Sequence, residues 1–324
     1  LMRSLKIMQE LGDRSSEGAI FGYIGGVYDD QEDYDKALEY YTRSLKIAQE
    51  LGNRNFEYSA FYNIGRVYRM QGDYPKALKY YLQHLKIVTE IGNREEESKI
   101  LSRIGIVYAA QAEYTKALEY YLKSMELCNE IGNTTMKGHV LNNIGTLYYL
   151  QEDYEKSHKY LLKSLKVKEE SHDSSDVAVS IGNLGELYFA MKKYQESIDS
   201  LQKAATIFDQ LGERQDLRWT TSLLALAALK SGDRAKAEEN AARAESIIAS
   251  SSKPVNDVDV LWNLSQVYSL LGNRQKSTLY LGHAYSEVMA RAGKLGFRTK
   301  RDAYLTKIKE NREILAAWEK LSNE

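Results

Sequence analysis

The sequence predicts an all-α protein, a right-handed α-solenoid (superhelix) of about seven helix-turn-helix units followed by a C-terminal capping helix. Two observations carry this prediction: a glycine recurs with a period of 40 residues, and a tyrosine recurs with the same period. A fixed period of this size is typical of repeat arrays, in which each unit packs only on its neighbours. The glycines are Gly25, Gly65, Gly105, Gly145 and Gly185, and the tyrosines are Tyr28, Tyr68, Tyr108, Tyr148, Tyr188 and, after Ala228, Tyr268.

The unit at 55–94 shows how each repeat predicts two helices. Apolar residues at helical spacing precede a short polar turn at 71–73, and a second apolar face begins near Tyr74. Gly92 supplies the left-handed conformation that ends the second helix. Pro75 lies at a helix start, where a missing N–H costs little. The only other proline, Pro254, is assigned to a linker before the last unit.

The period also divides the chain. Residues 1–14 resemble 41–54 and are interpreted as the second helix of a truncated repeat, so we expect a piece of a longer protein. Residues 15–293 hold the repeats, and 294–324 are expected to form one capping helix. The seven repeats are assigned to 15–54, 55–94, 95–134, 135–174, 175–214, 215–254 and 255–293.

Small and aromatic residues at fixed positions predict how the helices pack. A glycine inside a helix costs roughly 1 kcal/mol relative to alanine, so its recurrence indicates a close approach between the two helices of a unit. Ala37, Ala77 and Ala117 are assigned the same role on the second helix. The abundant tyrosines are interpreted as packing between helices with a polar tip at the surface.

The order Phe61, Ile64-Gly65, Tyr68, Ala77 and Tyr81 resembles the tetratricopeptide repeat (TPR). The 40-residue form is similar to the repeats of Pins/LGN adaptors, kinesin light chain and many bacterial signalling proteins. The segment ENREILAAWEKL at 310–321 resembles a closing segment of TPR regions in large bacterial signalling proteins. This resemblance implies a protein-protein interaction scaffold that binds a peptide in its concave groove.

Composition and motifs exclude several function classes. The formal net charge of −1 gives no overall attraction to nucleic acid or to an anionic membrane. A single cysteine, Cys128, excludes an internal disulfide and favours a reducing, cytoplasmic compartment. There is no phosphate loop, nucleophile elbow or metal-ligand spacing, so we expect no enzyme activity, no metal and no cofactor. The histidines are His84, His139, His158, His172 and His283.

Asparagine recurs on the first helix of several units, at a position that the TPR resemblance places on the concave face. A row of amides suits an extended peptide backbone, because each amide offers both a donor and an acceptor. The alternative is that asparagine belongs to the repeat consensus without binding anything. The residues are Asn63, Asn143, Asn183 and Asn263.

Basic residues break this row in the second to fourth units. Arg103 takes the asparagine position in the third unit, and Lys99 lies one turn earlier on the same helix. Arginine binds carboxylates in a bidentate manner, so an acidic peptide is the expected ligand. The alternative is a solvated basic surface. The carboxylate-clamp form of the family has five ligand-binding positions, and Asn63, Lys99 and Arg103 match three of them. The other two would fall on Gly22 and Gly26, which cannot supply the required side chains. The expected pocket comprises Arg66, Arg69, Lys99, Arg103 and His139.

The later units add aromatic residues to the same expected groove, namely Tyr149, Phe189 and Trp219. Basic and aromatic residues together would accept an amphipathic helix or peptide. Trp262 belongs to the same set, and packing in the cap is its alternative role.

Three alternatives to a scaffold remain. The chain could sense a signalling peptide or small ligand by changing its compactness, or it could regulate a catalytic domain outside this sequence. Nucleic-acid binding is the weakest, since basic residues are confined to a few turns. Self-association is expected through the truncated N-terminal end, where Leu5, Ile7 and Met8 lack their natural neighbour.

Overall fold

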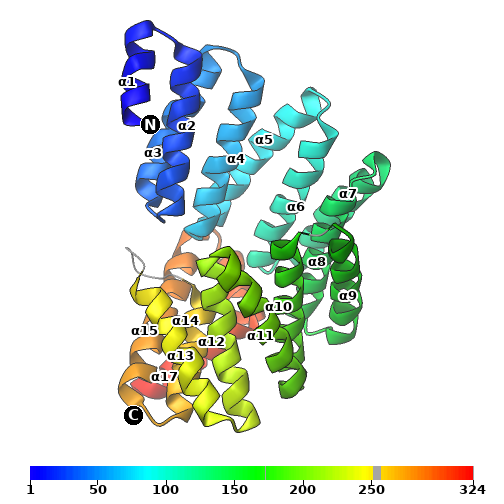
Figure 1. Cartoon of the computed structure of the whole chain (residues 1–324), viewed down its shortest axis with the longest axis vertical. Helices are drawn as coiled ribbons and strands as arrows, with labels where there is room; N and C mark the ends of the chain where they lie inside the picture. The colour runs from blue at the N-terminus through cyan, green and yellow to red at the C-terminus, as the bar shows by residue number, and fades with distance from the viewer. Residues whose placement is uncertain (172, 251–256, 324) are drawn as a thin grey trace. The chain divides into compact units, whose positions relative to one another are not determined.

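A computed structural model describes residues 1–171, 173–250 and 257–323, so Pro254 and His172 lie outside the described residues. In this part of the chain all regular structure is helical, and consecutive helices pack in pairs (Figure 1). The predicted fold class is therefore confirmed.

The chain forms two compact units, one of Leu1–Ile131 with Lys294–Arg298 and one of Gly132–Gly293 with Thr299–Glu324. The helices of residues 1–131 are α1 (Met2–Leu11), α2 (Arg14–Asp30), α3 (Tyr34–Glu50), α4 (Arg54–Met70), α5 (Tyr74–Glu90), α6 (Arg94–Ala110) and α7 (Tyr114–Ile131). Those that follow are α8 (Thr134–Leu150), α9 (Tyr154–Ser171), α10 (Ser174–Ala190), α11 (Tyr194–Leu211), α12 (Arg214–Ser231), α13 (Arg234–Ala249), α14 (Val258–Leu270), α15 (Arg274–Lys294), α16 (Arg298–Lys307) and α17 (Lys309–Ser322).

The turns between helices repeat one local design. An Asp or Asn caps the next helix by accepting a hydrogen bond from a backbone N–H three residues later, as Asp73 does from Lys76. The residue just before such a cap has a positive φ, and glycine supplies it in Gly72 and Gly92. Ala112 and Lys192 adopt the same left-handed conformation without being glycine.

The glycines inside the first helices accommodate a side chain of the second helix. A Cβ on Gly105 would lie 2.5 Å from the Tyr121 ring, and one on Gly145 would lie 2.8 Å from Leu161. Both distances are shorter than van der Waals contact allows. The predicted close approach is confirmed, and Ala117 on the second helix is fully buried, as predicted.

The recurring tyrosines form a repeated stack between the two helices of a pair. Tyr28 stacks on Tyr40 with ring centroids 5.5 Å apart and an interplanar angle of 8°. The ammonium group of Lys36 lies 4.9 Å from the Tyr28 ring centroid, a cation–π contact. The predicted packing role of these tyrosines is confirmed. The same stack recurs at Tyr68–Tyr80, Tyr108–Tyr120, Tyr148–Tyr160 and Tyr268–Tyr280.

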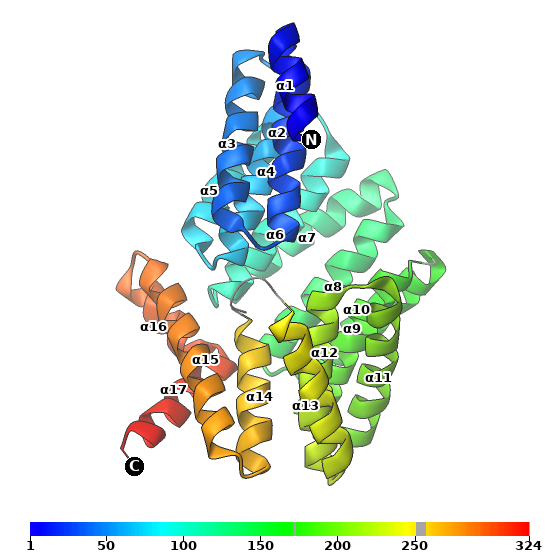
Figure 2. The same ribbon diagram turned by 60° about the vertical axis from the view of Figure 1, so that its left-hand side comes forward.

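Two terminal segments differ from expectation. Leu5 is buried with Phe21, Ile24 and Ile47, because α1 packs on the first complete helix pair. Of the apolar face expected at this end, Ile7 is exposed, whereas Leu5 is not. The expected single helix at 294–324 is divided between the end of α15, α16 and α17. An extended backbone at Ile308 separates α16 from α17. Figure 2 shows α15 and α17 from a second side.

Candidate functional site

Successive first helices contact one another, as α8 does with α10 and α10 with α12. We call the side of each unit formed by its first helices the inner face; these helices are α2, α4 and α6 in the first unit and α8, α10, α12 and α14 in the second. The predicted residues Asn63, Arg66, Arg69, Lys99 and Arg103 belong to the first unit. His139, Asn143, Tyr149, Asn183, Phe189 and Trp219 belong to the second.

Arg66 on α4 forms an ion pair with Asp29 on α2. The Asp29 carboxyl group is buried and also accepts a hydrogen bond of 3.3 Å from the Tyr41 hydroxyl. Burial raises the pKa of Asp29, and the positive charge of Arg66 offsets part of this rise. Arg66 therefore neutralises a buried acid inside the repeat array, which reduces the charge that it can offer to a ligand.

The remaining basic side chains of the first unit differ in their partners. The Lys99 ammonium lies 2.8 Å from carboxylate oxygens of both Glu95 and Glu96 on its own helix. Arg69 is half-buried, and its Nη2 lies 3.2 Å from the sulfur of Met70. Arg103 is exposed on α6 and has no ion-pair partner within the described residues. Among the described residues, neither Arg69 nor Arg103 forms an ion pair with a carboxylate, and Arg103 is the exposed one of the two.

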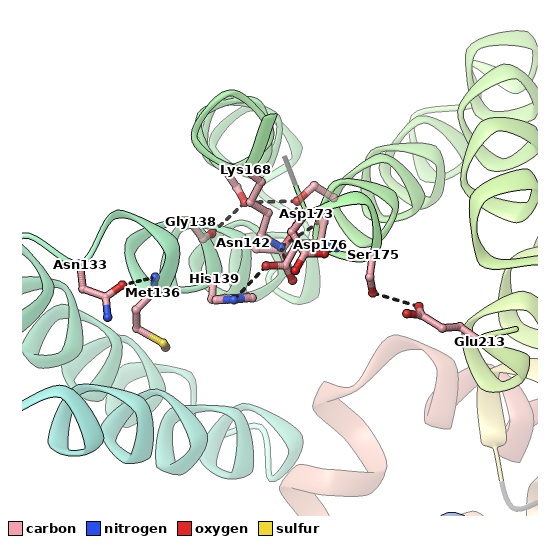
Figure 3. A network of polar contacts seen from close by, with 12 residues as sticks. Asn133, Met136, Gly138, His139, Asn142, Lys168, Asp173, Ser175, Asp176 and Glu213 are labelled. Atoms are coloured by element: carbon pink, nitrogen blue, oxygen red, sulfur yellow. Dashed lines mark hydrogen bonds and ion pairs between the residues drawn. The ribbon is translucent and has the colours of Figure 1, made fainter. Parts of the chain in front are cut away.

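In the second unit, His139 on α8 and Lys168 on α9 converge on Asp176 of α10 (Figure 3). His139 Nε2 lies 3.1 Å from Asp176 Oδ2, and Lys168 Nζ lies 3.8 Å from Oδ1. Lys168 also donates a 3.2 Å hydrogen bond to the Asp176 backbone carbonyl. Burial alone would raise the pKa of Asp176, but the hydrogen bond from His139 and the nearby charge of Lys168 bring it below its usual value.

Lys168 is the unusual member of this network because only 2% of its side chain is exposed. The same repeat position holds buried apolar residues in other units, such as Val88, Cys128 and Phe208. Burial lowers the pKa of Lys168, and the charges of Asp176 and Asp173 partly counteract this. Gly138 makes room for the lysine stem, since a Cβ there would lie 3.0 Å from Lys168 Cγ.

The asparagines of the second unit are partly engaged with one another. Asn183 donates a 3.1 Å hydrogen bond to the side-chain oxygen of Asn142, which also accepts one of 3.3 Å from Ser180. Asn143 and Asn183 are half-buried, whereas Asn263 is buried and donates to Ser222. Asn263 is therefore a packing residue, which agrees with the consensus alternative for that position.

The three predicted aromatic residues are half-buried, with one side in the packed interior. Tyr149 packs against Tyr154, with ring centroids 6.1 Å apart. Phe189 and Trp219 both pack against the apolar clusters of α11 to α14. Trp219 also fits against Gly182, where a Cβ would approach its ring to 2.9 Å.

The C-terminal helix α17 adds carboxyl and basic groups to the inner side of the second unit. Arg312 on α17 lies 3.3 Å from Glu152, next to α8. Loss of solvent, together with the carboxylates of Asp259 and Glu310, raises the pKa of Glu186 on α10 to about 8. Loss of solvent and the charge of Asp259 raise the pKa of Glu310 to about 7. Three acids on α10, α14 and α17 thus interact unfavourably when all are ionised.

Sequence reasoning missed Lys168, Asp176 and the acids around α17. Lys168 carries a detectable signal, because it is a lysine where the repeats otherwise place apolar side chains. The acids carry none, since they come from three segments far apart in the sequence. In the described segments, no three His, Cys, Asp or Glu residues are placed to hold a metal ion. No described helix has the length and apolarity needed to cross a membrane.

Several solved structures share this fold at low sequence identity. The Rap conjugation gene regulator of plasmid pLS20, in complex with the Phr* peptide, has a TM-score of 0.68 and 14% identity over 87% of this chain and 77% of its own. A Rap protein complexed with competence and sporulation factor has a TM-score of 0.61 and 14% identity, over 94% and 98% of the chains. A signal transduction ATPase with a TPR sensor from Pyrococcus horikoshii has a TM-score of 0.56 and 18% identity, over 93% and 46%.

No curated protein sequence matches the chain significantly. A family model of the tetratricopeptide repeat matches residues 16–90, 96–170 and 176–250, which together are more than half of the chain. This match agrees with the repeated glycine contacts and tyrosine stacks. The protein belongs to the tetratricopeptide repeat family.

Proposed function

We propose that the protein is a peptide-binding interaction module that holds an acidic or amphipathic segment on the inner faces of its repeats. In the first unit the acidic part of the ligand would pair with Arg103, flanked by Arg69 and Asn63. In the second unit, taken by itself, the backbone of such a segment would contact the amides of Asn143 and Asn183. Half-buried Tyr149, Phe189 and Trp219 would contact apolar side chains of the ligand.

The exposed guanidinium of Arg103 is the observation that carries this proposal. Arg66, Lys99 and His139 each face a carboxylate of the protein itself, whereas no described carboxylate pairs with Arg103. Arginine makes planar, two-point contacts with carboxylates, so an uncompensated arginine on the inner face favours an acidic ligand. One neighbour of similar fold was solved with the Phr* peptide and another with competence and sporulation factor, which supports a peptide as the class of ligand.

Fluorescence anisotropy with three related peptides tests the proposal. The first alternates glutamate with apolar residues, the second replaces each glutamate by glutamine, and the third replaces each by lysine. We expect the acidic peptide to bind tightest and Arg103→Glu to weaken it by about tenfold, the equivalent of roughly 1.4 kcal/mol. Lys79→Glu on α5 is the matched control, because it makes a similar charge change on a second helix. Equal binding of the three peptides, or equal losses in both variants, would contradict an acidic ligand at Arg103.

A sensor that changes compactness is the second candidate, and the division of the chain into two compact units favours it. Small-angle scattering with the acidic peptide separates the two functions. A scaffold keeps its radius of gyration when the peptide binds, whereas a sensor becomes measurably smaller.

We further propose that the module regulates a larger bacterial signalling protein. The resemblance of 310–321 to a closing segment of such proteins supports this, as does the similarity to a TPR sensor that forms part of an ATPase. Placing the module after a reporter ATPase would test it, because peptide addition should then change the ATPase rate. An unchanged rate despite peptide binding would leave a scaffold as the function.

A further inference from the structure

A cavity of about 570 Å³ lies in the second unit between α12, α14, α15 and α17. Figure 2 shows these helices. Its volume falls in the range of small-molecule sites, which is roughly 300–1,000 Å³. None of the residues that we assign to peptide binding lines this cavity, so it is a separate site.

The charge of the cavity wall is one-sided. Lys230 from α12, Arg274 from α15 and Lys320 from α17 line it, and none of its described lining residues is Asp or Glu. The whole chain has almost equal numbers of acidic and basic residues, 45 and 44, so the excess of positive charge is a local feature of the cavity. Lys230 and Lys320 are exposed and have no ion-pair partner in the part of the chain that the structure describes.

The rest of the wall combines an apolar surface with neutral polar groups. Trp262 and Leu281 provide the apolar part, and Gln266, Ser269 and Thr278 provide polar atoms. A pocket that combines apolar surface with placed polar groups can hold and orient a small ligand. Trp262 therefore has a surface that a ligand can contact, beyond the packing role considered for it.

The fourth side of the cavity is formed by α17, which is held in place from outside the cavity. Trp318 stacks on Tyr285 of α15, with ring centroids 4.9 Å apart and an interplanar angle of 14°. A Cβ on Gly282 would lie 3.3 Å from the Trp318 ring, so α17 lies close to α15 there. This contact positions Ala317, Lys320 and Leu321 along the cavity.

We propose that this cavity binds a small organic anion, whose phosphate or carboxylate pairs with Lys230, Arg274 and Lys320 while its apolar body contacts Trp262. The ligand would join α17 to α12, α14 and α15. This site is independent of the proposed peptide contacts, because no residue is shared between the two.

NMR of the tryptophan indole N–H groups in the full chain tests the site. The probes are phenyl phosphate, phenylacetate and the neutral benzyl alcohol, and a Trp262→Phe variant assigns the Trp262 signal. We expect both anions to shift this signal saturably and benzyl alcohol to bind about tenfold more weakly. Comparison of the two anions identifies which head group the site prefers. If neither anion shifts the Trp262 signal saturably, the proposal is wrong.

Charge reversal gives the matched comparison. Lys230→Glu/Lys320→Glu should weaken phenyl phosphate binding by about tenfold or more, since two attractive charges become repulsive. Lys166→Glu/Lys203→Glu changes the same net charge on exposed faces of α9 and α11 and should leave binding unchanged. Equal losses in the two double variants would overturn the proposal. Should the first variant unfold, the wild type still decides: binding must weaken with added salt, and a salt-independent affinity contradicts the site.

Discussion

The two units share one repeat pattern but fill equivalent buried positions with different side chains. In the first unit the space beside the helical glycine is filled by a tyrosine, as with Gly105 and Tyr121. The repeat position that Lys168 occupies in the second unit holds an apolar side chain here, such as Val88. In the second unit a leucine fills that space beside Gly145, and a buried lysine, Lys168, replaces an apolar residue. The repeat thus specifies the backbone, while single positions are open to polar substitution when a partner such as Asp176 is nearby.

The charged residues of the two inner faces also differ. In the first unit a cation, Arg66, neutralises a buried acid, and Arg103 has no carboxylate partner among the residues that the structure describes. In the second unit three acids, Glu186, Asp259 and Glu310, share one region with α17. On the proposed function, an acidic ligand would therefore bind the first inner face in preference to the part of the second unit that holds Glu186, Asp259 and Glu310. Four predictions test this comparison, beginning with the largest effect.

Loss of Asp176 should lower the free energy of unfolding by about 3 kcal/mol, because it removes a carboxylate that offsets the charge of the buried Lys168 ammonium. Lys168→Met should be neutral or stabilising, and Asp176→Ala should cost much less in that background. Urea denaturation of the two single variants and the double variant measures the coupling. Equal costs of Asp176→Ala in both backgrounds would show that the pair is not coupled.

Gly105→Ala should destabilise the protein by about 2 kcal/mol, although alanine is the better helix former, because its Cβ would overlap the buried Tyr121 ring. Gly145→Ala should cost less, since the leucine side chain there can shift more easily than a ring. Thermal and urea unfolding of the two variants give the comparison. A larger cost at Gly145 would contradict this account of the two units.

Raising the pH from about 6 to about 9 should weaken the docking of α17. Because the pKa values of Glu186 and Glu310 are raised in the folded state, folding takes up protons. The free energy of unfolding therefore falls as the pH rises from the pKa values of these groups in the unfolded chain to about 8, and then levels off. The Trp318 fluorescence should report the change. The groups that set it are Glu186, Asp259 and Glu310, together with Tyr149, Arg291, Asp257, Lys309 and Glu313.

Glu186→Gln/Glu310→Gln should flatten this pH dependence, because the glutamines cannot ionise. Lys166→Gln, at an exposed position of α9, is the control and should retain the slope. An equal slope in the double variant and the wild type would exclude these acids as its source.

Ala112→Gly should stabilise the protein slightly, by about 0.5–1 kcal/mol, because glycine tolerates the positive φ of this turn. Lys192→Gly should act similarly in the second unit. Ala109→Gly, inside α6, should instead destabilise by about 1 kcal/mol. Calorimetric melting temperatures measure all three, and destabilisation by Ala112→Gly would contradict the strain at that turn.

Much of the fold could be predicted from the sequence because each contact recurs. Gly65 and Tyr68 have equivalents at the same spacing in several units, so the sequence encodes the same helix packing several times. Local signals such as Asp73 before a helix and Gly72 in a turn report on their own neighbourhood. The break at Ile308 lacks such a signal, and the expected single C-terminal helix was wrong there.

The inner-face positions were predicted as a set, but their chemical state was not. Arg66, Lys99 and His139 were expected as a joint basic pocket, yet each has an acidic partner, in two of these cases on another helix. The membership of His139 in the second unit likewise depends on which helices pack together. Charge pairing between helices depends on distances that sequence spacing does not contain.

The sequence by itself determined the repeat, its helix pairs, its glycine contacts and its tyrosine stacks, because a local pattern repeated every 40 residues encodes all of them. Only the tertiary structure decided which charges remain uncompensated, why Lys168 can be buried and where α17 docks. Those features depend on side chains brought together from distant segments, where desolvation and electrostatic pairing set the outcome.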